Sequence, residues 1–178
     1  MNKFIYMIPI LVLGWLGYLH ISKPMEEDRD LQLVSMTVPE FSLEEISPTY
    51  GITNKIVESR NLPHKVIMIN IFASWCMACL REHRQLVTLA EEHNLSIYGI
   101  AYNDTEKAII KFFKHRENPY EKIALTPTIY NLNEWDMTGT PESFLIDANG
   151  MIRYRHKGPI LKQHVEDIIL PIIKEISK

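Results

Sequence analysis

Cysteine is scarce in this sequence. Of 178 residues only two are cysteines, Cys76 and Cys79, and two residues separate them. A disulfide between such close neighbours closes a very short loop and contributes little loop-closure entropy, which disfavours a disulfide framework that staples the fold. The chain also lacks an excess of positive charge, with a formal net charge of −3, and it has no internal repeat. These absences argue against a nucleic-acid partner and a repeat architecture, and the length suits one globular domain with short additions.

Charged residues are missing from one stretch near the N-terminus. Residues 4–21, FIYMIPILVLGWLGYLHI, contain no Asp, Glu, Lys or Arg. At about 1.5 Å per helical residue, this stretch nearly crosses a hydrocarbon core of about 30 Å. Lys3 precedes it and the acidic sequence EEDRD follows it. This asymmetry predicts an N-terminus in the cytoplasm and a body on the other side of the membrane.

We therefore expect three parts along the chain: a transmembrane signal-anchor at 1–22, a polar linker at 23–35 and a periplasmic globular domain at 36–178. No small-x-small cleavage site follows the apolar stretch, which favours an uncleaved, single-pass anchor in a bacterial inner membrane over a removed signal peptide. A buried helix of a soluble protein is the other alternative, although such helices usually have a polar face.

The remaining sequence alternates between strand patterns and helix patterns. We predict buried strands at 65–72 and 95–102, helices at 76–92 and 104–116, a β-hairpin from 143–147 and 151–158, and a last helix at about 161–176. Pro171 lies toward the C-terminal end of the last helix, where we expect a kink. This order predicts an α/β fold with a central mixed sheet and helices on both faces.

The cysteine pair follows the first of these strands directly. FASWCMACLREH places Cys76 where the helix begins and Cys79 one turn later on the same face. The first amides of a helix have no partner and favour thiolate over thiol, and such sites lower a cysteine pKa from about 8.5 to between about 3.5 and 7.5. We predict that Cys76 attacks a substrate disulfide and that Cys79 then resolves the mixed disulfide. A strand that runs into Cys-x-x-Cys at a helix start is the thioredoxin arrangement.

A metal site is the alternative for the same helix. His83 lies four residues after Cys79, so Cys76, Cys79 and His83 share one helical side. A closed zinc site needs four ligands, and neither a second Cys-x-x-Cys nor a His pair is visible. Copper accepts two thiolates and one imidazole, so copper binding stays open. We favour a surface or partner-facing position for His83 and predict no metal.

A proline precedes the predicted hairpin. TGTPESF places Thr140 and Pro141 just before the strand that begins near residue 143. In the thioredoxin fold a cis-proline at this point lies against the cysteine pair, and the cis form costs only about 0.5–1 kcal/mol before proline. We expect a cis bond here, with the backbone of Thr140 free to pair with an extended substrate. Trp75 and Pro141 are predicted as further substrate contacts.

These segments together resemble the membrane-anchored thiol:disulfide interchange proteins of cytochrome c maturation, the CcmG/DsbE type, with TlpA and ResA as relatives. NIFASWCMACLREH is similar to the active-site segment of that family. YGIAYND, with ENPY at 117–120, is similar to the strand, helix and loop that its members insert into the thioredoxin core. GTPESFLIDANGMIRYRHKGPI is similar to the family's Gly-x-Pro-Glu stretch and hairpin, and is the most specific match.

The resemblance implies a thioredoxin-like fold and a dithiol enzyme without a cofactor. Such an enzyme reduces disulfides of apocytochrome c, or of a maturation partner, because haem attachment needs free thiols in a Cys-x-x-Cys-His segment. The resemblance also implies a membrane thiol transporter of the DsbD or CcdA type as the electron donor. A copper-delivery protein of thioredoxin fold and a more general disulfide oxidoreductase remain as alternatives.

The sequence departs from the expected patterns in two places. The family often has proline between its cysteines, where this chain has Met77 and Ala78, so the redox potential cannot be carried over. Thioredoxin has a buried aspartate six residues before its first cysteine, and here that residue is Asn70, which cannot take a proton. The resemblance offers Glu142, directly after the cis-proline, as a replacement. We predict that Glu142 accepts the proton of Cys79 as a general base, with a solvated loop acid as the alternative.

Overall fold

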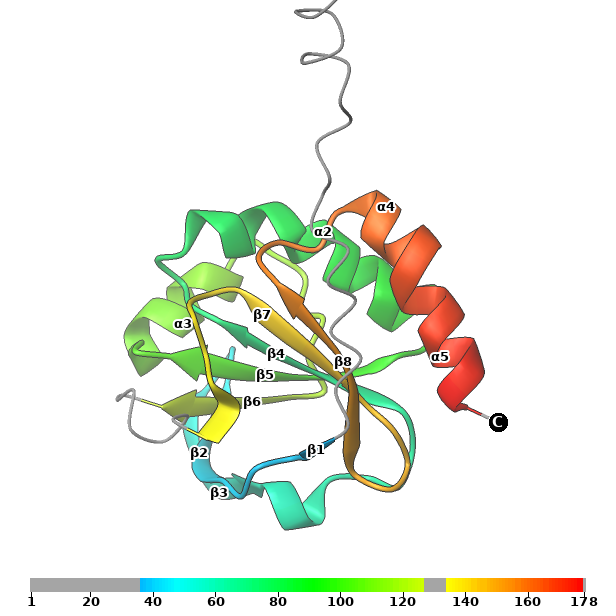
Figure 1. Ribbon diagram of the computed structural model, residues 1–178. Coiled ribbons are helices and arrows are strands. Elements are labelled where there is room, and N and C mark those ends of the chain that lie inside the picture. Colours follow the sequence, from blue (N-terminus) through cyan, green and yellow to red (C-terminus); the bar gives the residue numbers. More distant parts are fainter. Residues whose placement is uncertain (1–35, 127–133, 178) are drawn as a thin grey trace, which may run out of the picture. The chain divides into compact units, whose positions relative to one another are not determined.

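The computed structural model describes residues 36–126 and 134–177 (Figure 1). The described residues belong to one compact unit of the chain, Gln32–Lys178. The predicted signal-anchor at 1–22 and linker at 23–35 lie outside the described residues and stay predictions. Within the two described ranges, no helix is both long enough and apolar enough to cross a bilayer.

An eight-stranded sheet forms the centre of the domain (Figure 1). Its spatial order is β1-β8-β7-β4-β5-β6-β2-β3. β4, β5 and β6 run parallel to one another, and the other neighbouring pairs are antiparallel, so the predicted mixed sheet is confirmed. The strands are β1 (Met36–Thr37), β2 (Ser42–Ser47), β3 (Gly51–Glu58), β4 (Ile67–Phe72), β5 (Ser96–Tyr102), β6 (Lys122–Thr126), β7 (Glu142–Ile146) and β8 (Met151–Lys157).

β4 lies inside the sheet, and its sequence explains why. All six of its residues, IMINIF, are buried. A continuous run of this kind is typical of a strand that is covered on both faces. The neighbouring β5 is buried along five of its seven residues. The strands predicted at 65–72 and 95–102 are confirmed to within two residues at each end.

Four helical segments accompany the sheet in the described part of the chain, the short η2 and three longer ones. Two of the longer segments begin at side-chain caps, because the Cys76 sulfur accepts from an amide of α2 and the Thr105 hydroxyl accepts from an amide of α3. The helix predicted at 104–116 is shorter than expected. The helical elements are η2 (Ser59–Asn61), α2 (Met77–Glu91), α3 (Glu106–Phe113), and a C-terminal segment made of α4 (Lys162–His164), η4 (Val165–Ile169) and α5 (Leu170–Ile176).

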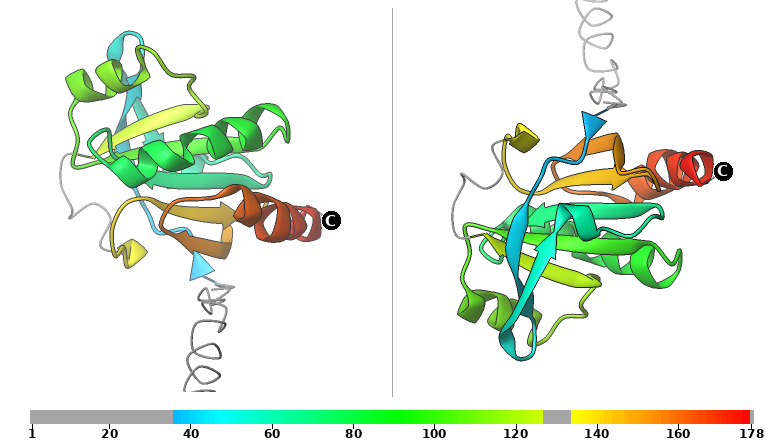
Figure 2. Two further views of the ribbon diagram at one scale, coloured as in Figure 1. Left: turned by 90° about the horizontal axis from the view of Figure 1, so that it is seen from above. Right: turned by 90° about the horizontal axis from the view of Figure 1, so that it is seen from below.

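Successive residues of β4 face two separate hydrophobic clusters. Met68 points into a cluster that contains buried side chains of α2, α3 and the C-terminal helical segment. Ile69 points into the other cluster, where Phe41 and Trp135 cover the sheet. The three longer helical segments therefore pack on one face, as the two views in Figure 2 show. The chain around Phe41 and Trp135 covers the second face. Among the described residues of this cover, the expectation of helices on both faces is met only by a short 3₁₀ turn at 134–135.

The C-terminal helical segment changes its winding just before Pro171. The π-helical η4 follows α4, and Pro171 lies in the first turn of α5. Proline has no N–H, and in a regular helix its ring collides with the carbonyl four residues earlier. A π-helical turn widens the helix at that place. The predicted kink therefore takes the form of a π-helical stretch ahead of Pro171.

The sequence patterns do not predict β1, β2, β3 or β6. β2 reads SLEEIS, which has only two buried residues, and it is held by pairing with both β3 and β6. Glu44 of β2 lies opposite Leu125 of β6, so this pairing joins distant parts of the chain. Strand propensity depends on such neighbours, which a local pattern does not contain.

Candidate active site

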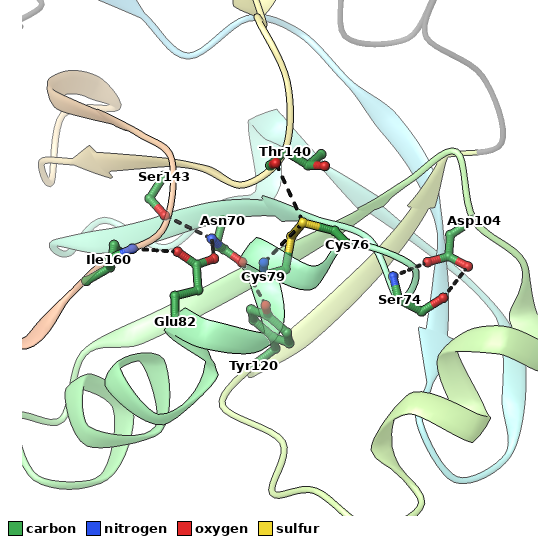
Figure 3. The surroundings of a disulfide bond; sticks show 10 residues. All are labelled: Asn70, Ser74, Cys76, Cys79, Glu82, Asp104, Tyr120, Thr140, Ser143 and Ile160. Atoms are coloured by element: carbon green, nitrogen blue, oxygen red, sulfur yellow. Dashed lines mark hydrogen bonds between the residues drawn. A yellow bond between two sulfur atoms is a disulfide. The ribbon is translucent and has the colours of Figure 1, made fainter.

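Cys76 is the N-terminal cap of α2, at the end of the loop that follows β4 (Figure 3). Cys76 and Cys79 form a disulfide, with their Cα atoms 5.3 Å apart. The backbone N–H of Cys79 donates to the Cys76 sulfur at 3.1 Å. That N–H is one of the amides that have no partner within the helix. The predicted position of Cys76 is confirmed, and the same amide stabilises a thiolate when the disulfide opens.

The segment that follows β5 holds the loop before Cys76. The buried Asp104 carboxylate accepts from the Ser74 backbone N–H at 2.6 Å and from the Ser74 hydroxyl at 2.9 Å. The indole N–H of Trp75 donates to the Asn103 carbonyl at 3.0 Å. Trp75 is thus held in place although 57% of it is exposed. A fixed and exposed aromatic ring suits contact with a peptide, the role predicted for Trp75.

The predicted cis bond between Thr140 and Pro141 is confirmed. It directly precedes β7, and the Thr140 carbonyl oxygen lies 3.6 Å from the Cys76 sulfur (Figure 3). A carbonyl in this position can accept a weak hydrogen bond from the reduced thiol. The structure therefore brings Thr140 to Cys76, and the contacts of Thr140, Pro141 and Trp75 with substrate stay predictions.

Glu142 is buried in an ion pair with Arg155. Its Oε2 accepts from the Nε and a terminal nitrogen of Arg155 at 2.9 Å and 2.7 Å. Its Oε1 accepts from the backbone N–H and the hydroxyl of Thr138, each at 2.7 Å, and from the Gly139 N–H at 3.2 Å. Alternate residues of β7 face opposite sides, so Glu142 shares the side of Phe144, which belongs to the cluster without helices.

This environment corrects the role predicted for Glu142. Cys79 belongs to the cluster on the helical face, opposite the one that Glu142 faces. Both carboxylate oxygens are occupied, and Arg155 neutralises the charge. Only 1% of Glu142 is exposed, so the alternative of a solvated loop acid is wrong as well. The geometry is that of a structural ion pair between β7 and β8.

A second glutamate, Glu82, is buried on the helical face (Figure 3). It lies one turn after Cys79 on α2. Its Oε1 accepts from the side-chain amide of Asn70 and its Oε2 from the Ile160 backbone N–H, both at 2.9 Å. Burial raises the pKa of Glu82 to about 7, and these two N–H donors oppose the rise. A carboxyl with such a pKa can take up and release a proton near neutral pH.

Asn70 connects Glu82 to the sheet. Its amide nitrogen donates to Glu82 and to the Ser143 hydroxyl, each at 2.9 Å. Its Oδ1 accepts from the Tyr120 hydroxyl at 2.7 Å. All four side chains are buried, and burial raises the pKa of Tyr120 well above its usual value, so its hydroxyl keeps the proton that it donates. Asn70 therefore orients an acid from α2.

Several residues of this site are not identified from the sequence, among them Glu82 and Tyr120. One signal for Glu82 exists, because Cys79, Glu82, Leu86 and Leu89 repeat at helical spacing and are all buried. A carboxyl within an apolar stripe is costly to bury without partners, and such a position marks a candidate site. Tyr120 comes from the loop before β6 and is the last residue of ENPY, which resembles the family's loop, but no pattern marks its hydroxyl as a partner of Asn70.

His83 is packed against aromatic rings. Its ring centroid lies 5.9 Å from that of Phe112 and 6.2 Å from that of Phe113, and burial lowers the pKa of His83. His83 is half-buried rather than fully on the surface, and a partner-facing role for it stays a prediction. In 36–126 and 134–177, no group of three His, Cys, Asp or Glu side chains is arranged to hold a metal ion.

Known proteins are similar to this chain in sequence. Residues 33–169 match the Redoxin family. The chain is 33% identical over 142 residues to the thiol:disulfide interchange protein DsbE of Allochromatium vinosum, covering 79% of this chain and 76% of the relative. It is 30% identical over 184 residues to DsbE of Vibrio cholerae, covering 99% and 97%. The chain belongs to the Redoxin family and, within it, to the DsbE proteins.

Solved structures share the fold at lower identity. The thioredoxin domain of a thiol-disulfide oxidoreductase from Bacteroides vulgatus superimposes with a TM-score of 0.65 at 16% identity, over 81% of this chain and 99% of that one. A secreted thiol-disulfide isomerase from Corynebacterium glutamicum gives 0.64 at 14% identity, over 85% and 96%. The predicted thioredoxin-like fold is confirmed. Like its DsbE relatives, this chain is a thiol:disulfide oxidoreductase. Its two cysteines, Cys76 and Cys79, form a disulfide at the start of α2.

Proposed function

We propose that this DsbE protein is a periplasmic reductant of cytochrome c maturation. Its substrate is a disulfide of apocytochrome c, or of a maturation partner, that must open before haem attachment. One observation carries the proposal: the Cys76 sulfur sits at the first amides of α2, 3.6 Å from the Thr140 carbonyl oxygen, and the preceding residue, Trp75, is exposed. An extended peptide along Thr140 can bring its own disulfide to Cys76 while it contacts Trp75.

The reaction begins with the reduced cysteine pair. The Cys76 thiolate attacks one sulfur of the substrate disulfide, which forms a mixed disulfide and releases one substrate thiolate. Cys79 then loses its proton and attacks the Cys76 sulfur, which closes the enzyme disulfide and releases the second substrate thiolate. Two electrons pass from the enzyme dithiol to the substrate, and the two substrate thiolates take up protons.

Glu82 is the group proposed to accept the Cys79 proton. It follows Cys79 by one helical turn, it lies on the same face, and its pKa of about 7 suits a general base near neutral pH. Glu142, which the sequence suggested, is already bonded to Arg155. The proposed general base is therefore Glu82 of α2 instead of Glu142 of β7.

The proposal includes a location and an electron source. The apolar stretch at 4–21 anchors the chain in the inner membrane, with residues 36–178 in the periplasm. The oxidised cysteine pair is returned to the dithiol by a membrane thiol transporter of the DsbD or CcdA type. The periplasm is oxidising, so a reductant there needs such a supply from across the membrane.

The trapping of mixed disulfides tests the proposal. Cys79→Ala leaves the Cys76 nucleophile without its resolving partner, so it should accumulate a covalent complex with apocytochrome c whose Cys-x-x-Cys-His segment is oxidised. Cys76→Ala is the matched control and should trap nothing. The complex should disappear on reduction in a non-reducing gel assay. Equal trapping by both variants would contradict the assignment, and trapping by neither would remove apocytochrome c as substrate.

The reduction potential of the cysteine pair tests whether electrons flow from the enzyme to its substrate. Equilibrium with glutathione gives the reduction potential of the pair. A strongly reducing value supports the reductant, and a value near about −120 mV, as in a strong oxidant, would overturn it.

A further inference from the structure

Tyr120 is a buried residue near the active site, and it makes no hydrogen bond to Cys76 or Cys79. Tyr120 is 6% exposed. Its ring stacks on the ring of Phe72, with 4.8 Å between the ring centroids and an interplanar angle of 21°. Gly99 of β5 makes room for that ring, because a Cβ there would lie 3.0 Å from it. The fold thus holds the Tyr120 ring firmly. Within the described ranges, its hydroxyl has one hydrogen-bond partner, Oδ1 of Asn70, at 2.7 Å.

The direction of that hydrogen bond decides which way the Asn70 amide faces. An amide side chain has an acceptor oxygen at one end and a donor NH₂ group at the other. Tyr120 donates its proton to the oxygen, so the nitrogen points the opposite way, toward Glu82 and Ser143. A nitrogen at that place donates to the Glu82 carboxylate and favours its ionised form.

We propose that Tyr120 is a positioning residue of the thiol:disulfide exchange, which fixes the Asn70 amide with its N–H groups toward Glu82 and thereby stabilises the Glu82 carboxylate. Without the hydroxyl, the amide can turn around and present its oxygen to Glu82. That arrangement accepts a hydrogen bond from the protonated carboxyl, so Glu82 keeps its proton to higher pH. Catalytic use of this control rests on the proposed function of Glu82 as the acceptor of the Cys79 proton.

Other titratable groups share this face of the sheet. β8 contributes His156, opposite Ser143 of β7, and its ring lies 4.6 Å from that of His164 in α4. α2 contributes the cysteine pair. These groups are the same in every variant considered below, so only differences between variants report on Tyr120.

The test is a carbon-13 NMR titration of the Glu82 carboxyl in the full-length, oxidised chain, where neither cysteine titrates. Glu82→Gln identifies the resonance, because that signal disappears. Tyr120→Phe keeps the ring and removes the hydroxyl, and it should raise the titration midpoint of Glu82 by about one pH unit, the effect of one hydrogen bond to a charged group.

Tyr98→Phe is the matched control. It also removes a hydroxyl from a tyrosine of the sheet, one that donates to Glu121 at 3.2 Å and lies in the cluster on the other face. This variant should leave the Glu82 midpoint in place. The proposal is overturned if Tyr120→Phe moves the midpoint no further than Tyr98→Phe does.

A double-mutant cycle tests the route through Asn70. Asn70→Ala should raise the Glu82 midpoint by itself, and adding Tyr120→Phe should raise it no further, because the amide that Tyr120 orients is gone. Two shifts that simply add would overturn the proposal. The rate at which Cys79 resolves a mixed disulfide is measured separately in Glu82→Gln. An unchanged rate there would defeat the proposed role of Glu82, while the NMR midpoints still decide the role of Tyr120.

Discussion

Glu82 and Glu142 are both almost completely buried near the cysteine pair, with exposed fractions of 0% and 1%, yet their surroundings differ in kind. Glu142 faces a guanidinium, which compensates its charge, and hydroxyl and amide donors fill its other oxygen. Glu82 has one amide donor on each oxygen and no cation among its recorded bonds in the described part of the chain. Burial alone therefore does not identify a functional acid, since the partners of each carboxylate decide whether its charge is compensated.

The largest expected difference between Glu82 and Glu142 is in the rate at which a mixed disulfide is resolved. If Glu82 accepts the Cys79 proton, Glu82→Gln should slow resolution of a preformed mixed disulfide by about 10²–10⁴-fold. Glu142→Gln should leave that rate nearly unchanged, because the Glu142 carboxylate is paired with Arg155. Stopped-flow measurement of thiol release at pH 7 gives both rates. Equal slowing by both variants would erase the distinction between the two acids.

The second test of the difference between the two acids removes the cation from the Glu142–Arg155 ion pair. Arg155→Met leaves the Glu142 carboxylate buried without its cation, which should lower the free energy of unfolding by about 3–5 kcal/mol. Arg153→Met on the same strand is the matched control. Its partner is Asp147 at 2.7 Å, but 41% of the Arg153 side chain is exposed, so its loss should cost about 1 kcal/mol or less. Urea unfolding measures both, and similar costs would contradict a structural role for the buried pair.

The third test uses the pH dependence of stability. The pKa of Glu82 is raised from 4.5 to about 7 in the folded protein, so the folded state holds the proton more tightly than the unfolded chain does. This contribution, about 3 kcal/mol, is fully present below pH 4.5 and is lost as pH rises through about 7. His83 acts in the opposite direction, because its lowered pKa adds stability as pH rises toward 6.5.

The difference between two variants isolates Glu82 from His83. Urea unfolding from pH 4 to 8 should show the Glu82 contribution in the wild-type chain and in Glu142→Gln, and should show none of it in Glu82→Gln. A wild-type curve that runs parallel to that of Glu82→Gln over this range would mean that Glu82 does not hold its proton more tightly in the folded protein.

Local sequence patterns predict the parts of the site that lie next to one another in the chain. A buried apolar run identifies β4, and the helix that follows places Cys76 at its N-terminus. The stripe of α2 even contains a signal for Glu82, although a carboxyl within it is easily taken for a surface charge. The edge strands are not predicted, because β2 becomes a strand only by pairing with β3 and β6.

By itself, the sequence determined the order of the central strands and longer helices (β4, α2, β5, α3, β7, β8 and the last helical segment), the position of the cysteine pair at the first amides of α2, and a proline directly before β7. These features depend on periodicity and on neighbours within a few residues. Only the tertiary structure decided which acid lies with the cysteines. Strand pairing turns Glu142 toward the face without helices, and the Glu82 side chain meets Asn70 and Ile160, which are 12 and 78 residues away in the chain. A charge buried in a protein is governed by such distant partners, because the low dielectric of the interior makes each of them count.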